Sequence, residues 1–225
     1  IISLINPKSP VTEAYRTLLT NIEYSSVDKQ IQMIAVTSSA PSEGKTTTAT
    51  NLAVAYSETG KNVLLVDCDL RKPRLHKVFN TSNLIGLTSV LASKSSLNDT
   101  VKPVKDGLSI LTSGPIPPNP VELIRSNMME QLINTLRDLF DVVIFDTPPV
   151  GLVTDAAIIS SKLDGVVLVV ASGKSQIEAT LRAKENLQNV NANLLGAVVT
   201  MIPIDTRGYQ YYTYGEEEQT KKKRR

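Results

Sequence analysis

One eight-residue segment constrains the fold of this chain more than any other. Residues 39–46 read SAPSEGKT, between an apolar segment typical of a buried strand (31–37, IQMIAVT) and a segment with a helical pattern (46–57). A loop between a strand and a helix N-terminus can surround phosphate oxygens with backbone N–H groups, while a lysine adds positive charge. The segment therefore predicts a phosphate-binding loop in an α/β protein.

The residues of this loop have distinct expected roles. Lys45 is expected to supply positive charge and Thr46 to place its hydroxyl on Mg²⁺. Ser39 replaces the first glycine of the common GxxxxGK[ST] pattern, and the alternative is a strand–turn–helix corner with an exposed lysine. The residues expected to contact the phosphates of ATP are Ser42, Glu43, Gly44, Lys45, Thr46 and Thr47.

Three aspartates follow two other expected strands. Asp146 ends the apolar run 142–145, and Asp67 and Asp69 lie in VLLVDCDLR at 63–71. In an open α/β sheet the ligand binds at the carboxyl ends of the strands, where a carboxylate can hold Mg²⁺. One of the three acids is then available to accept a proton, and Asp67 and Asp69 point the same way if the strand continues through both. The alternative for each is an aspartate that caps a turn or loop.

Strand-like and helical segments alternate along the 225 residues, which is typical of a parallel sheet with helices on both faces. We expect strands at 31–37, 62–67, 108–112, 141–146, 165–171 and 194–201. Helices are expected at 10–24, 46–57, 120–139, 155–162 and 177–188, the first capped by Ser9. This predicts an α/β fold with a mostly parallel central sheet, as one domain over 1–202 with the first helix in 1–28.

Composition excludes or disfavours several classes of site and partner. The single cysteine, Cys68, excludes an internal disulfide and disfavours a cysteine-based zinc site, and the single histidine, His76, disfavours Ser-His-Asp chemistry. No apolar run approaches 18 residues and no signal peptide opens the chain, so a cytoplasmic location is expected. The net charge of +2 becomes −3 without the basic run at 221–225, so no nucleic-acid partner is expected.

Tyrosines are concentrated near the C-terminus. Beyond residue 202 the chain loses its periodicity, and we expect a disordered, polar tail at 203–225. Four of the seven tyrosines fall in this tail, at Tyr209, Tyr211, Tyr212 and Tyr214. The cluster is either a low-complexity end or a set of phosphoacceptor hydroxyls.

Taken in order, these segments resemble the bacterial protein-tyrosine kinases of capsular and exopolysaccharide synthesis, called BY-kinases. The resemblance rests on TSSAPSEGKTTT, LLVDCDLRKP, SGPIPPNPVELI, DVVIFDTPPV and the tyrosine-rich end, and it covers nearly the whole chain. It implies a P-loop NTPase-like fold and ATP-dependent phosphorylation of tail tyrosines between subunits, which regulates polysaccharide synthesis and export. It also implies a membrane-anchored adaptor that activates the kinase and recruits it to the inner face of the membrane, other tyrosine substrates and a cognate phosphatase.

The resemblance also implies roles for individual residues. By motif position Asp67 would be the base, while Asp69 and Asp146 would belong to the magnesium site with Thr46. The family's N-terminal helix usually carries E-x-x-R-x-x-R at subunit contacts; Glu13 and Arg16 match it, but Leu19 occupies the third position. We therefore expect a homo-oligomer that associates weakly, through a stripe of residues spaced by three on this helix.

Two other function classes remain to be tested. A nucleotide-switch ATPase of the cell-division-site or plasmid-partition type shares the expected fold, but those proteins carry a lysine five residues before the main one, where this chain has Ala40. A non-enzymatic regulator could bind nucleotide and signal through its tail alone. The presence of Lys45, Asp67 and Asp146 argues against it.

Overall fold

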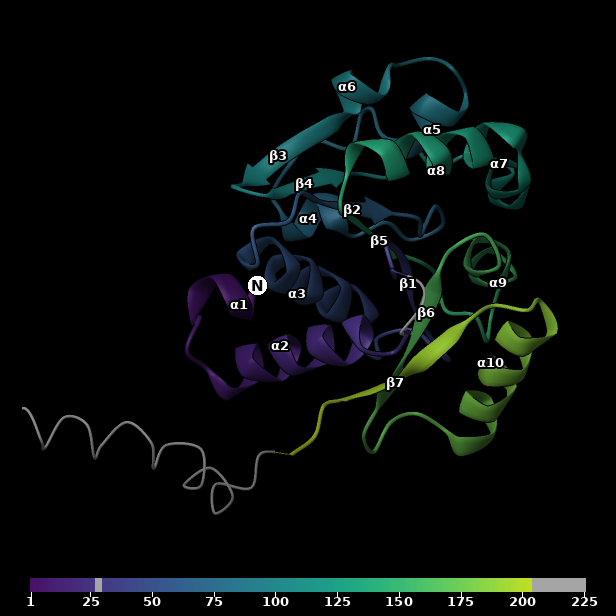
Figure 1. Ribbon diagram of the computed structural model, residues 1–225. Helices are drawn as coiled ribbons and strands as arrows, with labels where there is room; N and C mark the ends of the chain where they lie inside the picture. The colour runs from purple at the N-terminus through teal and green to yellow at the C-terminus, as the bar shows by residue number, and fades with distance from the viewer. Residues whose placement is uncertain (27–29, 204–225) are drawn as a thin grey trace, which may run out of the picture.

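The computed structural model describes residues 1–26 and 30–203. At its centre lies a seven-stranded sheet in the order β3–β4–β2–β5–β1–β6–β7 (Figure 1). Neighbouring strands are parallel throughout, except that β3 runs antiparallel to β4 at one edge. The strands are β1 (Met33–Ser38), β2 (Val63–Asp67), β3 (Val101–Lys105), β4 (Leu108–Leu111), β5 (Val142–Asp146), β6 (Gly165–Ala171) and β7 (Leu194–Thr200). The predicted α/β class with a mostly parallel sheet is confirmed.

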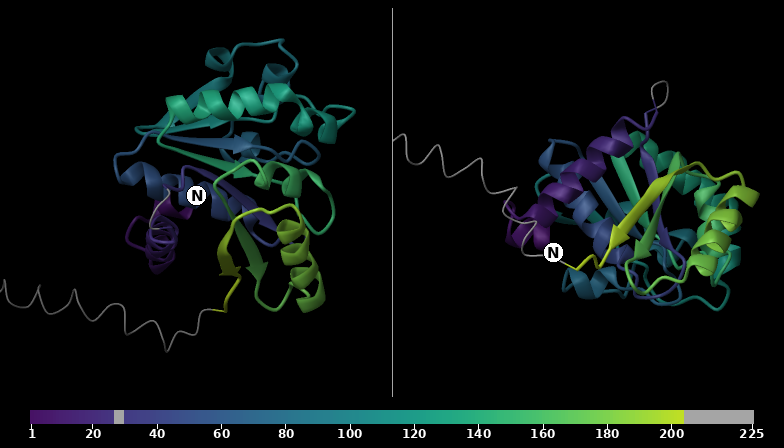
Figure 2. Two further views of the ribbon diagram at one scale, coloured as in Figure 1. Left: turned by 45° about the vertical axis from the view of Figure 1, so that its right-hand side comes forward. Right: turned by 90° about the horizontal axis from the view of Figure 1, so that it is seen from below.

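Ten helices occur in the described residues, and they lie on both faces of the sheet (Figure 2). The helices at 45–58, 127–139 and 177–189 each lie between two successive parallel strands, which is the arrangement that the alternating sequence pattern predicts. The helices are α1 (Ile2–Ile5), α2 (Pro10–Glu23), α3 (Lys45–Glu58), α4 (Leu75–Val78), α5 (Leu87–Leu91), α6 (Leu97–Thr100), α7 (Pro120–Arg125), α8 (Asn127–Leu139), α9 (Asp155–Ser160) and α10 (Ile177–Asn189).

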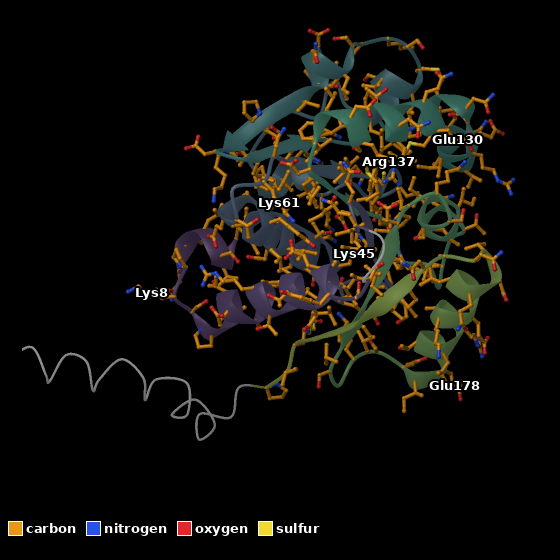
Figure 3. The ribbon with its side chains drawn as sticks, viewed as in Figure 1. Lys8, Lys45, Lys61, Glu130, Arg137 and Glu178 are labelled. Atoms are coloured by element: carbon orange, nitrogen blue, oxygen red, sulfur yellow. The ribbon has the colours of Figure 1, made fainter. Side chains whose placement is uncertain are left out.

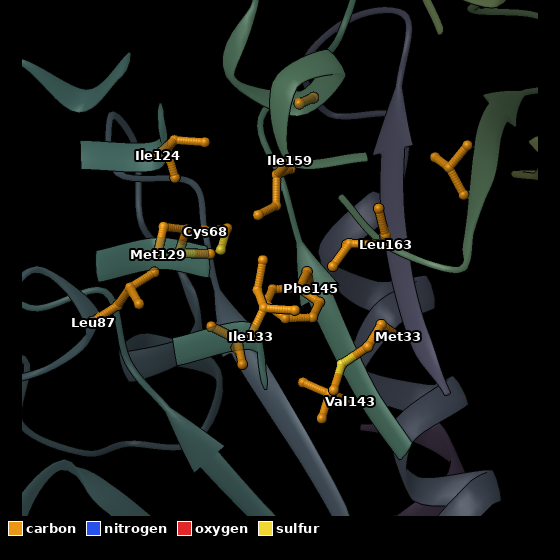
Figure 4. Close-up of a cluster of buried hydrophobic side chains, with 14 of the residues drawn as sticks. Met33, Cys68, Leu87, Ile124, Met129, Ile133, Val143, Phe145, Ile159 and Leu163 are labelled. Carbon is orange, nitrogen blue, oxygen red and sulfur yellow. The ribbon is translucent and has the colours of Figure 1, made fainter. Parts of the chain in front are cut away.

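The sheet separates two hydrophobic cores. Successive side chains of a strand point to opposite faces, so Met33 of β1 enters one core and Ile34 enters the other. The first core packs against α5 and α7–α10, with Phe145 and Ile133 among its members (Figure 4). The second core packs against α2 and α3. Because both faces are covered, the central strands are buried along their whole length, which explains their continuous apolar sequences.

Two expected features differ in the structure. Strand β3 has no counterpart among the predicted strands, because Lys102, Pro103 and Lys105 interrupt any strand-like pattern. The structure places β3 at the edge of the sheet, where a strand tolerates proline and charged residues. The helix expected at 120–139 divides into α7 and α8 at Ser126. Ser126 has extended backbone angles, and its hydroxyl accepts a hydrogen bond from the N–H of Met129, so it caps a new helix instead of continuing the old one.

The N-terminal helix α2 packs on α3. As predicted, the Ser9 hydroxyl caps it by accepting a hydrogen bond from the N–H of Thr12, and Pro10 begins the helix. Leu19 is 6% exposed and belongs to the core beside α3. The expectation that Leu19 extends an intersubunit stripe is therefore wrong: residues spaced by three drift around a helix of 3.6 residues per turn, and the drift carries Leu19 inward.

Candidate active site

The phosphate-binding loop connects β1 to α3 at the carboxyl edge of the sheet, as predicted. Gly44 is the N-cap of α3 and has φ of 95°, a left-handed conformation that glycine adopts without strain. A side chain at Gly44 would also come within 3.3 Å of Thr200 at the end of β7. The loop therefore presents the N-terminus of a 14-residue helix, with its unsatisfied N–H groups, toward the edge of the sheet.

Glu43 supports this loop from inside. Its carboxylate is buried and accepts hydrogen bonds from the Ser39 hydroxyl at 2.9 Å and the Ala40 N–H at 2.9 Å. It also accepts one from the hydroxyl of Ser175, which follows β6. Sequence reasoning grouped Glu43 with the phosphate contacts, but its side chain is turned into the loop. Its carboxylate therefore fixes the loop's shape, and only its backbone remains for a ligand.

Further contacts to the loop come from residues that sequence reasoning missed. Lys174 Nζ donates to the carbonyl oxygen of Ser42 at 2.8 Å, and the Thr200 hydroxyl donates to the carbonyl oxygen of Glu43 at 2.6 Å. These partners lie more than 130 residues away in the chain and belong to no recognisable motif. Only the pairing of β1, β6 and β7 brings them to the loop.

Lys45 lies between two of the three predicted aspartates. Its Nζ is 3.1 Å from Oδ1 of Asp146 and 3.3 Å from Oδ2 of Asp69, and its side chain is 11% exposed. Although burial lowers the pKa of Lys45, the Asp146 and Asp69 carboxylates raise it above its ordinary value. Burial raises the pKa of Asp146, against the opposing effect of Lys45 and the Thr46 hydroxyl, which donates to Asp146 Oδ2 at 2.6 Å.

Asp67 is fully buried beside this cluster. Its Oδ2 accepts hydrogen bonds from the N–H groups of Arg74 at 3.0 Å and Leu75 at 2.9 Å, whereas Oδ1 accepts only a longer bond of 3.3 Å from the N–H of Asp69. Burial, reinforced by the charge of Asp146, raises the pKa of Asp67 to about 7 despite the two backbone N–H donors. Strand β2 ends at Asp67. This end agrees with the strand predicted at 62–67; the strand does not continue through Asp69, yet Asp69 still reaches Lys45.

A pocket of about 440 Å³ opens over these groups. Its walls include the loop residues Ser42 and Gly44 to Thr47, together with Asp69, Pro148, Pro149 and Met201. Arg71 also lines it, held by Asp155 through two contacts of 3.2 Å. Met201 comes directly after β7, so the chain leaves the sheet at the rim of this pocket. Figure 3 shows Lys45 at the centre of the molecule, where α3 meets the sheet.

The oxygen atoms available as metal ligands in this site suit Mg²⁺ better than a metal whose ligands must all come from protein side chains. Within residues 1–26 and 30–203, no group of three or more His, Cys, Asp or Glu side chains is arranged to hold a metal. Mg²⁺, however, takes only one or two carboxylates and completes its shell with water and phosphate oxygens. The Thr46 hydroxyl and the Asp146 carboxylate, in contact at 2.6 Å, form such a partial set.

The remaining predicted residues lie elsewhere or beyond the described part. Arg16 pairs within its own chain, with Glu13 of the same helix at 3.1 Å and with Glu58 of α3 at 3.0 Å. The segment 203–225, with Tyr209, Tyr211, Tyr212 and Tyr214, lies outside the described residues except for residue 203. Across the described part of the chain, no helix is long and apolar enough to cross a membrane.

Comparison with known proteins relates this geometry to a family. A family model described as an AAA domain matches residues 31–201. Tyrosine-protein kinase YwqD of Bacillus subtilis is 47% identical over 214 residues, which cover 94% of this chain and 90% of that protein. The chain belongs to the family of bacterial tyrosine-protein kinases. The putative tyrosine-protein kinase CapB of Staphylococcus aureus is 35% identical over 94% of this chain and 93% of its own length.

Solved structures agree with this assignment. The chimerical protein CapA2B2 matches with a TM-score of 0.88 and 43% identity over 90% of each chain. The kinase domain of Escherichia coli tyrosine kinase ETK matches with a TM-score of 0.87 and 30% identity, over 91% of this chain and 81% of that one. The cell-division ATPase MinD of Pyrococcus furiosus is more distant, with a TM-score of 0.64 over 75% of this chain. The predicted tyrosine-protein kinase, rather than the nucleotide-switch ATPase, is thereby confirmed.

Proposed function

We propose that this kinase transfers the γ-phosphoryl group of ATP to the tyrosines at 209–214 of a neighbouring copy, and thereby regulates synthesis and export of a capsular or extracellular polysaccharide. The observation that carries the proposal is that Lys45 contacts Asp146 and Asp69, and Thr46 contacts Asp146, beside the N-terminus of α3. A nucleotide-binding loop beside several strand-end acids provides both phosphate binding and a proton acceptor.

Charge stabilisation is the main contribution expected of such a site. The backbone N–H groups of the loop and the Lys45 ammonium bind the phosphate oxygens of ATP. Lys45 exchanges its carboxylate partners for these oxygens when nucleotide enters. Thr46 and Asp146, with Asp69 beside them, would hold Mg²⁺, which neutralises phosphate charge when bound.

Asp67 accepts the proton of the tyrosine hydroxyl. A phenol has a pKa near 10, so a base is needed at neutral pH. The raised pKa of Asp67, about 7, suits it to take a proton and release it again. Its Oδ2 already accepts two hydrogen bonds, so Oδ1 is the oxygen that remains for the proton.

The segment after β7 is long enough for transfer between copies. Tyr209 follows Met201, at the rim of the pocket, by eight residues, which span up to about 26 Å when extended. We further propose a domain over 1–202 with a tyrosine-bearing tail over 203–225. Its proposed partners are a membrane-anchored adaptor that activates the kinase and brings it to the inner face of the membrane, other tyrosine substrates and a cognate phosphatase.

Mass spectrometry after incubation with ATP and Mg²⁺ tests the reaction directly, and phosphate is expected on the four tail tyrosines. The variant with Phe at 209, 211, 212 and 214 should lose most autophosphorylation but keep ATP binding. For transfer between copies, this variant is mixed with a Lys45→Met, Asp146→Asn chain whose tail is intact. Phosphotyrosine should appear on the tail of the inactive chain, and its absence there would show that transfer occurs within one copy. Absence of phosphotyrosine from the native protein as well would refute the kinase reaction.

A further inference from the structure

A second pocket lies beside the nucleotide pocket and is strongly basic. Five basic side chains line it: Arg71, Lys72, Arg74, His76 and Lys77, from the loop after β2 and from α4. The turn after β4, at 114–116, forms the opposite wall, and the volume is about 630 Å³. We call this the basic pocket. It belongs to the same carboxyl edge of the sheet as the phosphate-binding loop.

Most charges of the basic pocket have no partner among the described residues. The side chains of Lys72, Arg74 and Lys77 make no ion pair or hydrogen bond within 1–26 and 30–203, and only Arg71 is neutralised, by Asp155. His76 adds a buried Nδ1 that lacks a hydrogen-bond partner in this part of the chain.

Several, though not all, of the basic residues elsewhere in the described part of the chain are engaged in ion pairs. Lys61 pairs with Glu23, and Arg137 pairs with Asp164 at 2.7 Å (Figure 3 labels both basic residues). Lys162 likewise pairs with Glu130. Concentrating like charges without partners is unfavourable, so the basic pocket is suited to an anionic ligand.

The position of the basic pocket relates it to the reaction. Arg71, Lys72 and Arg74 line both the basic pocket and the nucleotide pocket. A ligand bound in the basic pocket therefore lies next to the site where a tyrosine must meet the nucleotide. A polypeptide that carries acidic residues a short distance from a tyrosine could occupy both pockets at once.

The chain itself contains such a sequence. Glu216–Glu218 is the only run of three consecutive acidic residues in the 225, and it begins two residues after Tyr214. The two to six extended residues between either Tyr212 or Tyr214 and this run span roughly 7–20 Å, a distance that adjoining pockets can accommodate. We propose that the basic pocket binds the acidic run 216–218 of another copy's tail and so positions Tyr212 or Tyr214 for phosphorylation. This inference rests on the proposed function and adds the feature by which the substrate is recognised.

The test compares two peptides as substrates of the full chain. One is 207–220, RGYQYYTYGEEEQT, and the other carries Gln at 216, 217 and 218. The enzyme carries Phe at its own four tail tyrosines and Gln at 216–218, so that its tail does not compete. We expect KM to be about three- to tenfold higher for the Gln peptide, with kcat within about twofold, since a few exposed charge pairs are lost.

Lys77→Glu supplies the matching change in the basic pocket, because Lys77 lines this pocket and not the nucleotide pocket. It should raise KM for the acidic peptide by a similar factor, while KM for the Gln peptide and for ATP stay unchanged. The control is Lys94→Glu, an exposed lysine that lines neither pocket and should change nothing.

The outcomes separate this inference from the proposed function. Equal KM values for the two peptides, with both phosphorylated, would overturn docking and leave the kinase reaction intact. A rise in KM for ATP with Lys77→Glu would overturn it as well, because the pocket would then serve the nucleotide phosphates. If ATP is hydrolysed but neither peptide gains phosphate, the proposed reaction fails, and docking fails with it.

Discussion

Replacing Lys45 by Met should destabilise the nucleotide-free protein as well as abolish phosphotransfer. The ammonium of Lys45 contacts two carboxylates, Asp146 and Asp69, which are 1% and 9% exposed. Each pair is worth about 4 kcal/mol at 4 Å with an effective dielectric constant near 20, and the cost of burying the ammonium offsets a large part of the sum. We expect a net loss of about 3 kcal/mol in the free energy of unfolding at pH 8.

The direction in which the stability loss of Lys45→Met changes with pH distinguishes this mechanism from a general packing defect. Burial already raises the pKa of Asp146, and loss of Lys45 raises it further. The folded variant then binds protons at higher pH than the unfolded chain, so its stability increases as the pH falls. The deficit relative to the native protein should therefore be smaller at pH 5 than at pH 8.

Urea denaturation without nucleotide or Mg²⁺, at pH 5 and pH 8, measures both effects. The double variant Lys45→Met, Asp146→Asn serves as the matched control, because it removes the buried charge left by the first change and should recover much of the stability. A Lys45→Met protein within 0.5 kcal/mol of the native value at pH 8, or a deficit equal at both pH values, would refute the reasoning.

Three further predictions concern other parts of the chain. Asp67→Asn should reduce phosphotransfer by roughly 10²–10⁴-fold with a smaller effect on ATP affinity; equal losses in both would make Asp67 a metal or structural residue. Burial raises the pKa of Asp164, but Arg137 and backbone N–H groups lower it below its ordinary value, so Arg137→Ala should cost about 1 kcal/mol at pH 7, a figure reduced for solvent screening of this partly exposed pair. That loss should diminish as the pH falls below about 4 and Asp164 is protonated, and urea titrations at pH 3 and pH 7 would show it. Arg16→Ala should weaken self-association in light scattering over a dilution series, whereas Lys8→Ala should not; an oligomer insensitive to both dilution and Arg16→Ala would exclude α2 as the contact.

Much of the fold follows from local sequence pattern. Six of the seven strands and the five long helical segments were predictable, because a buried parallel strand is continuously apolar and a helix is periodic and capped, as Ser9 shows for α2. Strand β3 was not, since Pro103 and two lysines give no strand signal and only pairing with β4 makes it a strand. The break at Ser126 was also missed, because an apolar periodicity continues across it and the capping hydroxyl decides the geometry.

The candidate site likewise has a part that could be predicted from the sequence and a part that could not. Lys45, Thr46, Asp67, Asp69 and Asp146 could be named from the sequence because each stands where a strand ends or a helix begins, and parallel strands place these ends at one edge. Their assignment as catalytic and metal residues stays a proposal.

Tertiary structure alone decided how these groups are held. It turned Glu43 inward to Ser175, brought Thr200 of β7 against the loop, and gave Arg16 an intrachain partner in Glu58. It also gathered the basic side chains around α4 into a pocket beside the nucleotide site. The physical reason is that sequence pattern reports the period and burial of one segment, whereas hydrogen bonds and charge pairs between distant segments depend on strand order and register, which no local pattern encodes.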